Sequence, residues 1–180
     1  MPTARRPAHA PNDLDVLRDF VNASDPGGER LAAFWRTVRG LLAANAELGE
    51  PGPWLADFNA TLDWLGAVPR LHSARRTGIT VVPGGEVRAT IGRLAAIVLD
   101  AVNAGTFPRL KLCANPECGR AFYDHGRNAA GRWCDMAVCG NRAKVAGYRS
   151  RRRAAGGDGP ADRPHSIDEA MTRLAIRDPR

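Results

Sequence analysis

Four cysteines in two close pairs constrain this chain of 180 residues more than any other feature. Cys113 and Cys118 form the first pair, and fifteen residues separate it from Cys134 and Cys139. Each pair can present two thiolates from one turn, which is the arrangement of a tetrahedral zinc site. Structural sites use four protein ligands, so we expect one structural zinc ion. The spacing alone leaves open disulfides, reduced core thiols or an iron–sulfur cluster.

The N-terminal residues favour a cytoplasmic location. Residues 1–11 contain arginines but no apolar run after them, which excludes a secretory signal. The longest apolar run, Leu94–Leu99, is too short to cross a bilayer. We therefore expect no membrane association, and in a reducing cytosol paired cysteines are more often metal ligands than disulfides.

All of the excess positive charge lies around the cysteines. The chain has a formal net charge of +7, and residues 111–153 contain ten Lys or Arg against three Asp or Glu. The rest of the chain has sixteen of each sign. A zinc ion with four thiolates would lower the charge of this region but leave it basic. A confined basic patch favours a polyanionic partner, most often nucleic acid.

The apolar pattern predicts an α+β fold, mainly α, with a helical N-terminal domain over residues 12–107. Helical spacing predicts helices around 14–21, 29–48, 54–65 and 87–105. A Thr- and Val-rich stretch, 71–82, predicts a small β-hairpin that turns at Thr77-Gly78. The predicted zinc module spans 108–153 and follows with almost no linker, so the two parts should pack together.

The two ends of the chain predict no stable fold of their own. Residues 1–11 have the composition of a disordered leader. Residues 154–180 begin with Gly, Asp and Pro and are expected to form a flexible tail. Ser166 and Glu169 have the spacing of a capping box, which would start a short terminal helix.

Within the module, the sequence predicts a treble-clef-like arrangement of turn, hairpin and helix. Residues 120–124 are expected to form a strand, Gly126–Gly131 a turn, and Arg132-Trp133 the returning strand. A helix should follow from Met136 to about Arg153 and carry the last cysteine.

A helical wheel at about 100° per residue separates the side chains of that helix. Val138, Val145 and Tyr148 form a narrow apolar arc by which the helix could pack. Basic residues flank the arc on both sides and could contact phosphates. Two alternatives stay open: these charges are simply solvated, or those nearest the metal are counterions of the negatively charged zinc–thiolate centre. The flanking residues are Arg142, Arg149 and Arg153 on one side and Lys144 and Arg151 on the other.

One segment resembles a known family. Arg127-Asn128, Arg132-Trp133-Cys134, Met136 and the run Cys139-Gly140-Asn141-Arg142 are similar to the CGNR zinc finger family. The resemblance covers about residues 110–153. It implies a zinc-binding, DNA-binding module of bacterial, stress-induced transcription regulators. Such proteins carry an N-terminal ABATE domain, and Asp19–Asn22 is similar to its opening segment.

The sequence therefore predicts a zinc-containing DNA-binding regulator of transcription and no enzyme, since no catalytic motif is evident. Its helical domain would sense a small-molecule effector of unknown identity or mediate association, for instance as a homodimer. A protein-interaction adaptor with a purely structural zinc module is the alternative, although no exposed apolar patch is evident. Charge alone does not separate RNA from duplex DNA as the partner. The candidate nucleic-acid contacts are Arg127, Arg132, Arg142, Lys144, Arg149, Arg151, Arg152 and Arg153.

Other candidates favour structural roles. His125 lies between the cysteine pairs, but four cysteines complete the zinc shell, so it is predicted to be a turn residue. The aromatic residues of the module are expected to form the core of the hairpin rather than stack on bases. Trp35, Trp54 and Trp64 are expected in the core or at a domain interface rather than in a ligand cage.

Overall fold

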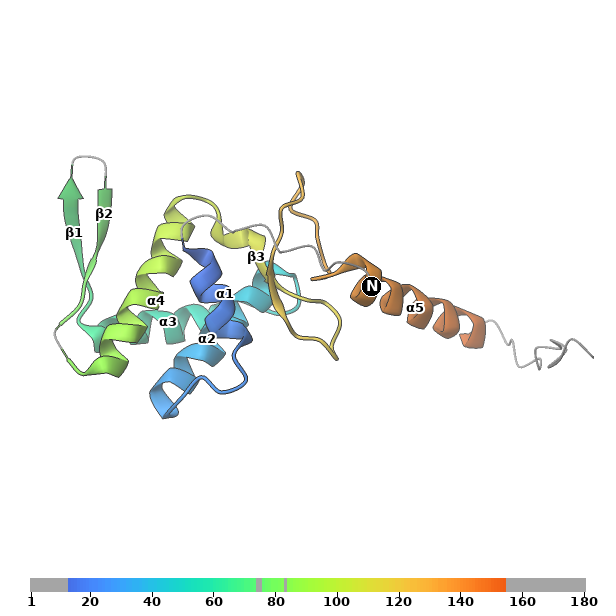
Figure 1. The fold of residues 1–180 in the computed structure, drawn as a ribbon, viewed down its shortest axis with the longest axis horizontal. Helices are drawn as coiled ribbons and strands as arrows, with labels where there is room; N and C mark the ends of the chain where they lie inside the picture. The colour runs from blue at the N-terminus through green and yellow to red at the C-terminus, as the bar shows by residue number, and fades with distance from the viewer. Residues whose placement is uncertain (1–12, 74–75, 83, 155–180) are drawn as a thin grey trace, which may run out of the picture. The chain divides into compact units, whose positions relative to one another are not determined.

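The computed structural model describes residues 13–73, 76–82 and 84–154, and it divides into two compact units between Ala143 and Lys144. The predicted leader and most of the predicted tail, with its terminal helix, lie outside the described residues. Figure 1 shows the order of the elements. The helices are α1 (Leu14–Asn22), α2 (Glu29–Asn45), α3 (Gly52–Leu65), α4 (Glu86–Asn103), a 3₁₀ turn (Phe107–Arg109), a π-helical turn (Met136–Gly140) and α5 (Asn141–Ala154). The strands are β1 (Val68–Ser73), β2 (Arg76–Thr80), β3 (Leu110–Leu112) and β4 (Ala121–Tyr123).

Helices α1 to α4 form where the apolar spacing predicted them, and their apolar faces meet in one core. Leu17 and Val38 are fully buried in it, and the rings of Phe34 and Phe58 pack against each other with centroids 6.1 Å apart. The mainly α fold class of the sequence prediction is thereby confirmed. Within the described residues no helix is long and apolar enough to cross a membrane.

The first hairpin exists, but its predicted turn is wrong. Thr77 and Gly78 lie inside β2, opposite Leu71 and Arg70, and Ser73 pairs with Arg76. The cause lies at the end of α3. Gly66 adopts a left-handed backbone conformation (φ 58°) that ends the helix and sends the chain directly into β1. The first strand therefore starts earlier than predicted.

The strand pairing of the cysteine region also differs from the prediction. β4 pairs with β3, which precedes the first cysteine, and not with the segment Arg132-Trp133. That segment has no strand structure, although the carbonyl of Arg132 accepts a hydrogen bond from Ala114 N–H at 2.8 Å. Cys113 and Cys118 therefore lie in the loop of the β3–β4 hairpin, which places the first cysteine pair close to the helices.

Two asparagines attach this hairpin to the helices. The amide of Asn22, at the end of α1, exchanges two hydrogen bonds with the backbone of Ala121, at 3.0 and 2.8 Å. Asn45, at the end of α2, donates to the carbonyls of Phe107 and Leu110. Leu110, Leu112 and Ala121 complete the same apolar core as the helices. The apolar core thus continues across residue 107, from the helices into the β3–β4 hairpin.

Candidate metal centre

The four cysteine thiols meet at one point. Their Sγ atoms all lie within 4.8 Å of one another, and no other His, Cys, Asp or Glu of the described residues joins the group. Cys134 Sγ is 3.6 Å from Cys118 Sγ and 3.8 Å from Cys139 Sγ. Four sulfurs bound to one zinc ion at about 2.3 Å lie about 3.8 Å apart. The site can therefore hold one zinc ion with four thiolate ligands.

The first pair is arranged by Asn115, which lies between its two cysteines. Its backbone carbonyl accepts from Cys118 N–H at 2.9 Å, and its side-chain oxygen accepts from Glu117 N–H at 3.2 Å. Its amide nitrogen donates to Cys139 Sγ at 3.7 Å. Asn115 is buried, so one residue shapes the first turn and also orients a sulfur of the second pair. Such partners outside the metal shell position the ligands.

Cys139 of the second pair lies on a π-helical turn whose start is capped, and Cys134 comes just before that turn. The carboxylate of Asp135 accepts hydrogen bonds from the backbone N–H groups of Ala137 and Val138, at 2.7 and 3.0 Å. Gly140 is buried, and a Cβ atom there would lie 2.4 Å from Met136 Sδ. A side chain at position 140 would therefore have to displace the flexible thioether end of Met136.

The thiols cannot all ionise without a cation. Burial raises the pKa of the Cys134 thiol far above its usual value, and hydrogen bonds with Cys118 and Cys113 raise it further. Burial also acts to raise the pKa of Cys118, but hydrogen bonds from the backbone of Arg120 and from the neighbouring thiols lower it overall. A positive ion among the sulfurs would favour ionisation of the thiols, because it offsets the charge that burial opposes. This donor set fits zinc.

A buried ion pair supports the loop between the cysteine pairs, and the sequence analysis missed it. Lys111 Nζ lies 3.2 Å from Asp124 Oδ2, and both side chains are less than a tenth exposed. Lys111 also donates to the carbonyls of Ala129 and Gly131. Asp124 accepts from the backbone N–H groups of Gly126 and Gly131, at 2.8 and 2.6 Å. These two side chains therefore hold the whole loop 124–131.

The same contacts decide the ionisation of the carboxyl group. Burial acts to raise the pKa of Asp124, but the hydrogen bonds from Gly126 and Gly131 and the charge of Lys111 lower it overall. The carboxylate therefore stays charged inside the protein. The only signal in the sequence was the charge of Lys111 inside a strand of three residues, which is too short to show alternation.

The arginines nearest the four thiols lie at the surface. Arg132 and Arg142 are exposed, and among the described residues neither donates a hydrogen bond to a cysteine sulfur. Arg132 instead lies over the ring of Trp133, 5.7 Å from its centroid. Arg127 is also exposed. These three candidate contacts are thus free to meet solvent or a ligand.

The other candidate contacts lie on α5, which buries no residue. Lys144, Arg149, Arg151, Arg152 and Arg153 are all exposed. The helix begins at Asn141, so Val138 belongs to the preceding π-helical turn and not to the predicted apolar arc. In the remaining arc, Val145 is 48% exposed and Tyr148 is 59% exposed. An exposed apolar face therefore exists where the sequence suggested none.

The remaining residues of the module lie around the hairpin. Tyr123 packs against the apolar core, and its ring contacts His125 edge-on with centroids 4.8 Å apart. His125 is not part of the thiol group. Phe122 and Trp133 are half-buried. The partial burial of these aromatic residues accords with structural roles, and His125 lies in the loop that follows β4.

The comparison with protein families agrees with the resemblance seen in the sequence. Residues 109–152 match the CGNR zinc finger family, over a segment that begins at β3 and ends near the end of α5. The match and the thiol cluster together identify a zinc finger module in this part of the chain. The match does not extend to residues 13–107, so their likeness to the ABATE domain stays a prediction. No curated protein matches the chain.

Proposed function

We propose that the protein is a cytoplasmic, DNA-binding regulator of transcription, in which α5 contacts phosphates and the helical domain senses a ligand or mediates association. One observation carries the proposal: α5 has six cationic side chains, no acidic residue and no buried residue. An exposed helix of this charge suits the phosphates of a duplex. The zinc centre has a positioning role in this proposal, since four thiolates leave no coordination position open for a reacting water.

Stabilisation of the helix alone does not account for this charge. Arg151, Arg152 and Arg153 lie in the last turn, where cations interact favourably with the helix dipole. Arg142, Lys144 and Arg149 lie in earlier turns, where that effect is small. Positive charge along the whole helix therefore favours the binding of a polyanion and is not explained by stabilisation of the helix.

A second candidate function rests on Val145 and Tyr148. They are three positions apart, so they share one face of α5, and both are about half exposed. A protein partner could cover that face, which would make the module an adaptor with a structural zinc ion.

A salt titration distinguishes these functions. The protein should bind a duplex with an affinity that falls as salt rises, and replacing Arg149, Arg151 and Arg153 by glutamine should change the slope of log K against log salt by about 2 to 3. Zinc content should not change, since these residues lie ten or more positions after Cys139. Neutralising Arg30, Arg36 and Arg93, which are exposed on α2 and α4, is the matched control.

The outcome decides among the candidates. An unchanged affinity and slope in the α5 variant would leave the adaptor as the better function. Tighter binding to single-stranded or duplex RNA than to duplex DNA of the same sequence would make RNA the partner.

A further inference from the structure

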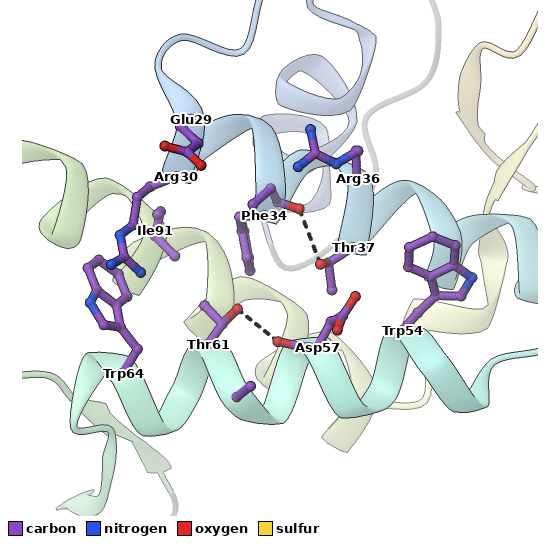
Figure 2. Close-up of a pocket in the computed structure, with 12 residues that line it drawn as sticks. Glu29, Arg30, Phe34, Arg36, Thr37, Trp54, Asp57, Thr61, Trp64 and Ile91 are labelled. Atoms are coloured by element: carbon purple, nitrogen blue, oxygen red, sulfur yellow. Dashed lines mark hydrogen bonds between the residues drawn. The ribbon is translucent and has the colours of Figure 1, made fainter.

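A groove between α2 and α3 forms a second candidate site, far in sequence from the cysteines. It encloses a cavity of about 530 Å³, within the usual range for sites that bind small molecules. Figure 2 shows its residues: α2 forms one wall and α3 the other. Phe34 and Ile91, 2% and 1% exposed, form an apolar floor that belongs to the core. The groove is thus built into the fold.

The two helices approach each other closely at one end of the groove. At Gly40 of α2 a Cβ atom would lie 2.1 Å from the ring of Trp54 on α3, so only glycine permits this contact. Beyond it, small side chains line the facing walls and cannot fill the space between the helices. These are Ala33 and Thr37 on α2 and Ala60 and Thr61 on α3.

Tryptophans stand at the two ends of the groove. Trp54 and Trp64 are half-buried, and within the described part of the chain neither indole N–H has a hydrogen-bond partner. Trp35, by contrast, lies outside the groove and donates to the carbonyl of Val21 at 3.0 Å. Arginine guanidinium groups from α2 and α4 lie over Trp64, which holds that ring in place. Aromatic rings therefore bound the groove at both ends.

The two walls of the groove carry side chains of opposite charge. The hydroxyls of Thr37 and Thr61 donate to carbonyls of their own helices, so toward the groove they can only accept. Arg36 lies on the α2 wall and Asp57 on the α3 wall, and neither forms an ion pair within the described residues. Glu29 and Arg30 add one charge of each sign at the rim. A ligand that complements these side chains carries one positive and one negative group, so its net charge is zero.

We propose that this groove binds a small zwitterionic molecule with a flat apolar body, whose carboxylate meets Arg36 and whose ammonium group meets Asp57. The body lies on the apolar floor between the tryptophans. Phe34 contributes to the floor and also packs on Phe20 of α1 and Phe58 of α3. Occupancy is thereby connected to the packing of three helices. The inference rests on the proposed sensing role of the helical domain but not on DNA binding.

Three related compounds test the charge pattern on the full-length zinc protein without DNA. The zwitterion is 4-(aminomethyl)benzoate, and 4-methylbenzoate and 4-methylbenzylamine each keep one of its charges. None of them is an amino-acid chelator of zinc. By calorimetry and tryptophan fluorescence, the zwitterion should bind about tenfold more tightly than either single-charge compound, because each charged hydrogen bond contributes roughly one decade.

Two variants assign the charges. Asp57→Asn should weaken zwitterion binding about tenfold and leave 4-methylbenzoate binding unchanged, while Arg36→Gln should weaken both. The matched controls are Asp63→Asn and Arg93→Gln, exposed positions on α3 and α4 that do not line the groove. All four substitutions replace exposed residues of helices, and circular dichroism verifies that each variant is folded.

Equal binding of the three compounds by the wild-type protein, or no binding of the zwitterion, would overturn the proposal. So would an equal effect of Asp57→Asn and Asp63→Asn. Failure of the protein to bind nucleic acid would overturn the proposed function but would leave these results unaffected, so the two failures are distinguishable.

Discussion

The helical core and the cysteine turns belong to the same compact unit, but different interactions stabilise them. The core buries apolar side chains from α1 to α4 and reaches Leu110, Leu112 and Ala121 of the β3–β4 hairpin. Beyond Ala121 the buried groups are mainly polar or sulfur-containing, such as Asp124 and Cys139. Burial of apolar area stabilises the first region. The second depends on hydrogen bonds, one ion pair and the metal. The two regions should therefore respond separately to the same perturbations.

Loss of the metal should have the largest effect, and it should be confined to the cysteine turns. Cys134→Ser removes a sulfur that lies next to two other thiols. Zinc binding supplies on the order of 10 kcal/mol in small zinc folds. We expect zinc content to fall from about one ion per chain to near zero, while α1 to α4 and the β3–β4 pair stay folded. Metal analysis and hydrogen exchange measure this.

Chelation of zinc from the wild-type protein should reproduce the same exchange pattern. Loss of most helical circular dichroism in either experiment would show that the core and the turns form one cooperative unit. That result would contradict the expectation that the two regions respond separately.

Breaking the buried ion pair should have the next largest effect. Lys111→Met leaves the Asp124 carboxylate buried without its cation, and removing one partner of such a pair costs about 3 to 5 kcal/mol. Urea unfolding in excess zinc measures the loss, with exposed Lys144→Met as the control. Loop 124–131 should lose its exchange protection first. A cost below about 1 kcal/mol would mean that the backbone N–H groups alone stabilise Asp124.

Two glycine variants compare the rigidity of the regions directly. At Gly40 an added Cβ would meet the indole of Trp54, whereas at Gly140 it would meet the flexible end of Met136. Overpacking costs about 1 to 3 kcal/mol, and we expect Gly40→Ala near the upper end and Gly140→Ala near the lower end. Thermal unfolding in excess zinc gives both values. The reverse order would indicate that the cysteine turn is the more rigid region.

The last prediction concerns the dependence of zinc affinity on pH, which leaves the fold of both regions unchanged. The raised pKa of Cys134 keeps this thiol protonated near pH 7 in the metal-free protein, so zinc uptake must release its proton. Affinity should therefore rise with pH, by about tenfold per pH unit for each proton released. Competition with a chromogenic chelator between pH 6 and pH 8 measures the slope. An affinity independent of pH would show that the thiols are already ionised, contrary to the pKa shift.

Helix positions were predictable because they depend on local spacing. The apolar periodicity of residues 29–45 and 86–103 reports a buried face directly, and both helices are confirmed. The β3–β4 pairing was missed because strands of three residues show no alternation. The turn at Thr77-Gly78 was wrong because Gly66 had already directed the chain into a strand. Local sequence patterns failed to predict strand positions and pairing where residues outside the segment determined them.

The amino-acid sequence was sufficient for the zinc ligands and for the charge of the last helix. Both depend on residue types at close spacing. Two short turns can bring four thiols together, and the charge of a helix follows directly from its residues. The groove, the Lys111–Asp124 pair and the two asparagine bridges needed the folded chain. Asn22 meets Ala121 across 99 positions, and Arg36 and Asp57 face the groove from different helices. Such contacts form only after the core has packed, because burial selects which polar groups must pair and which remain free for a ligand.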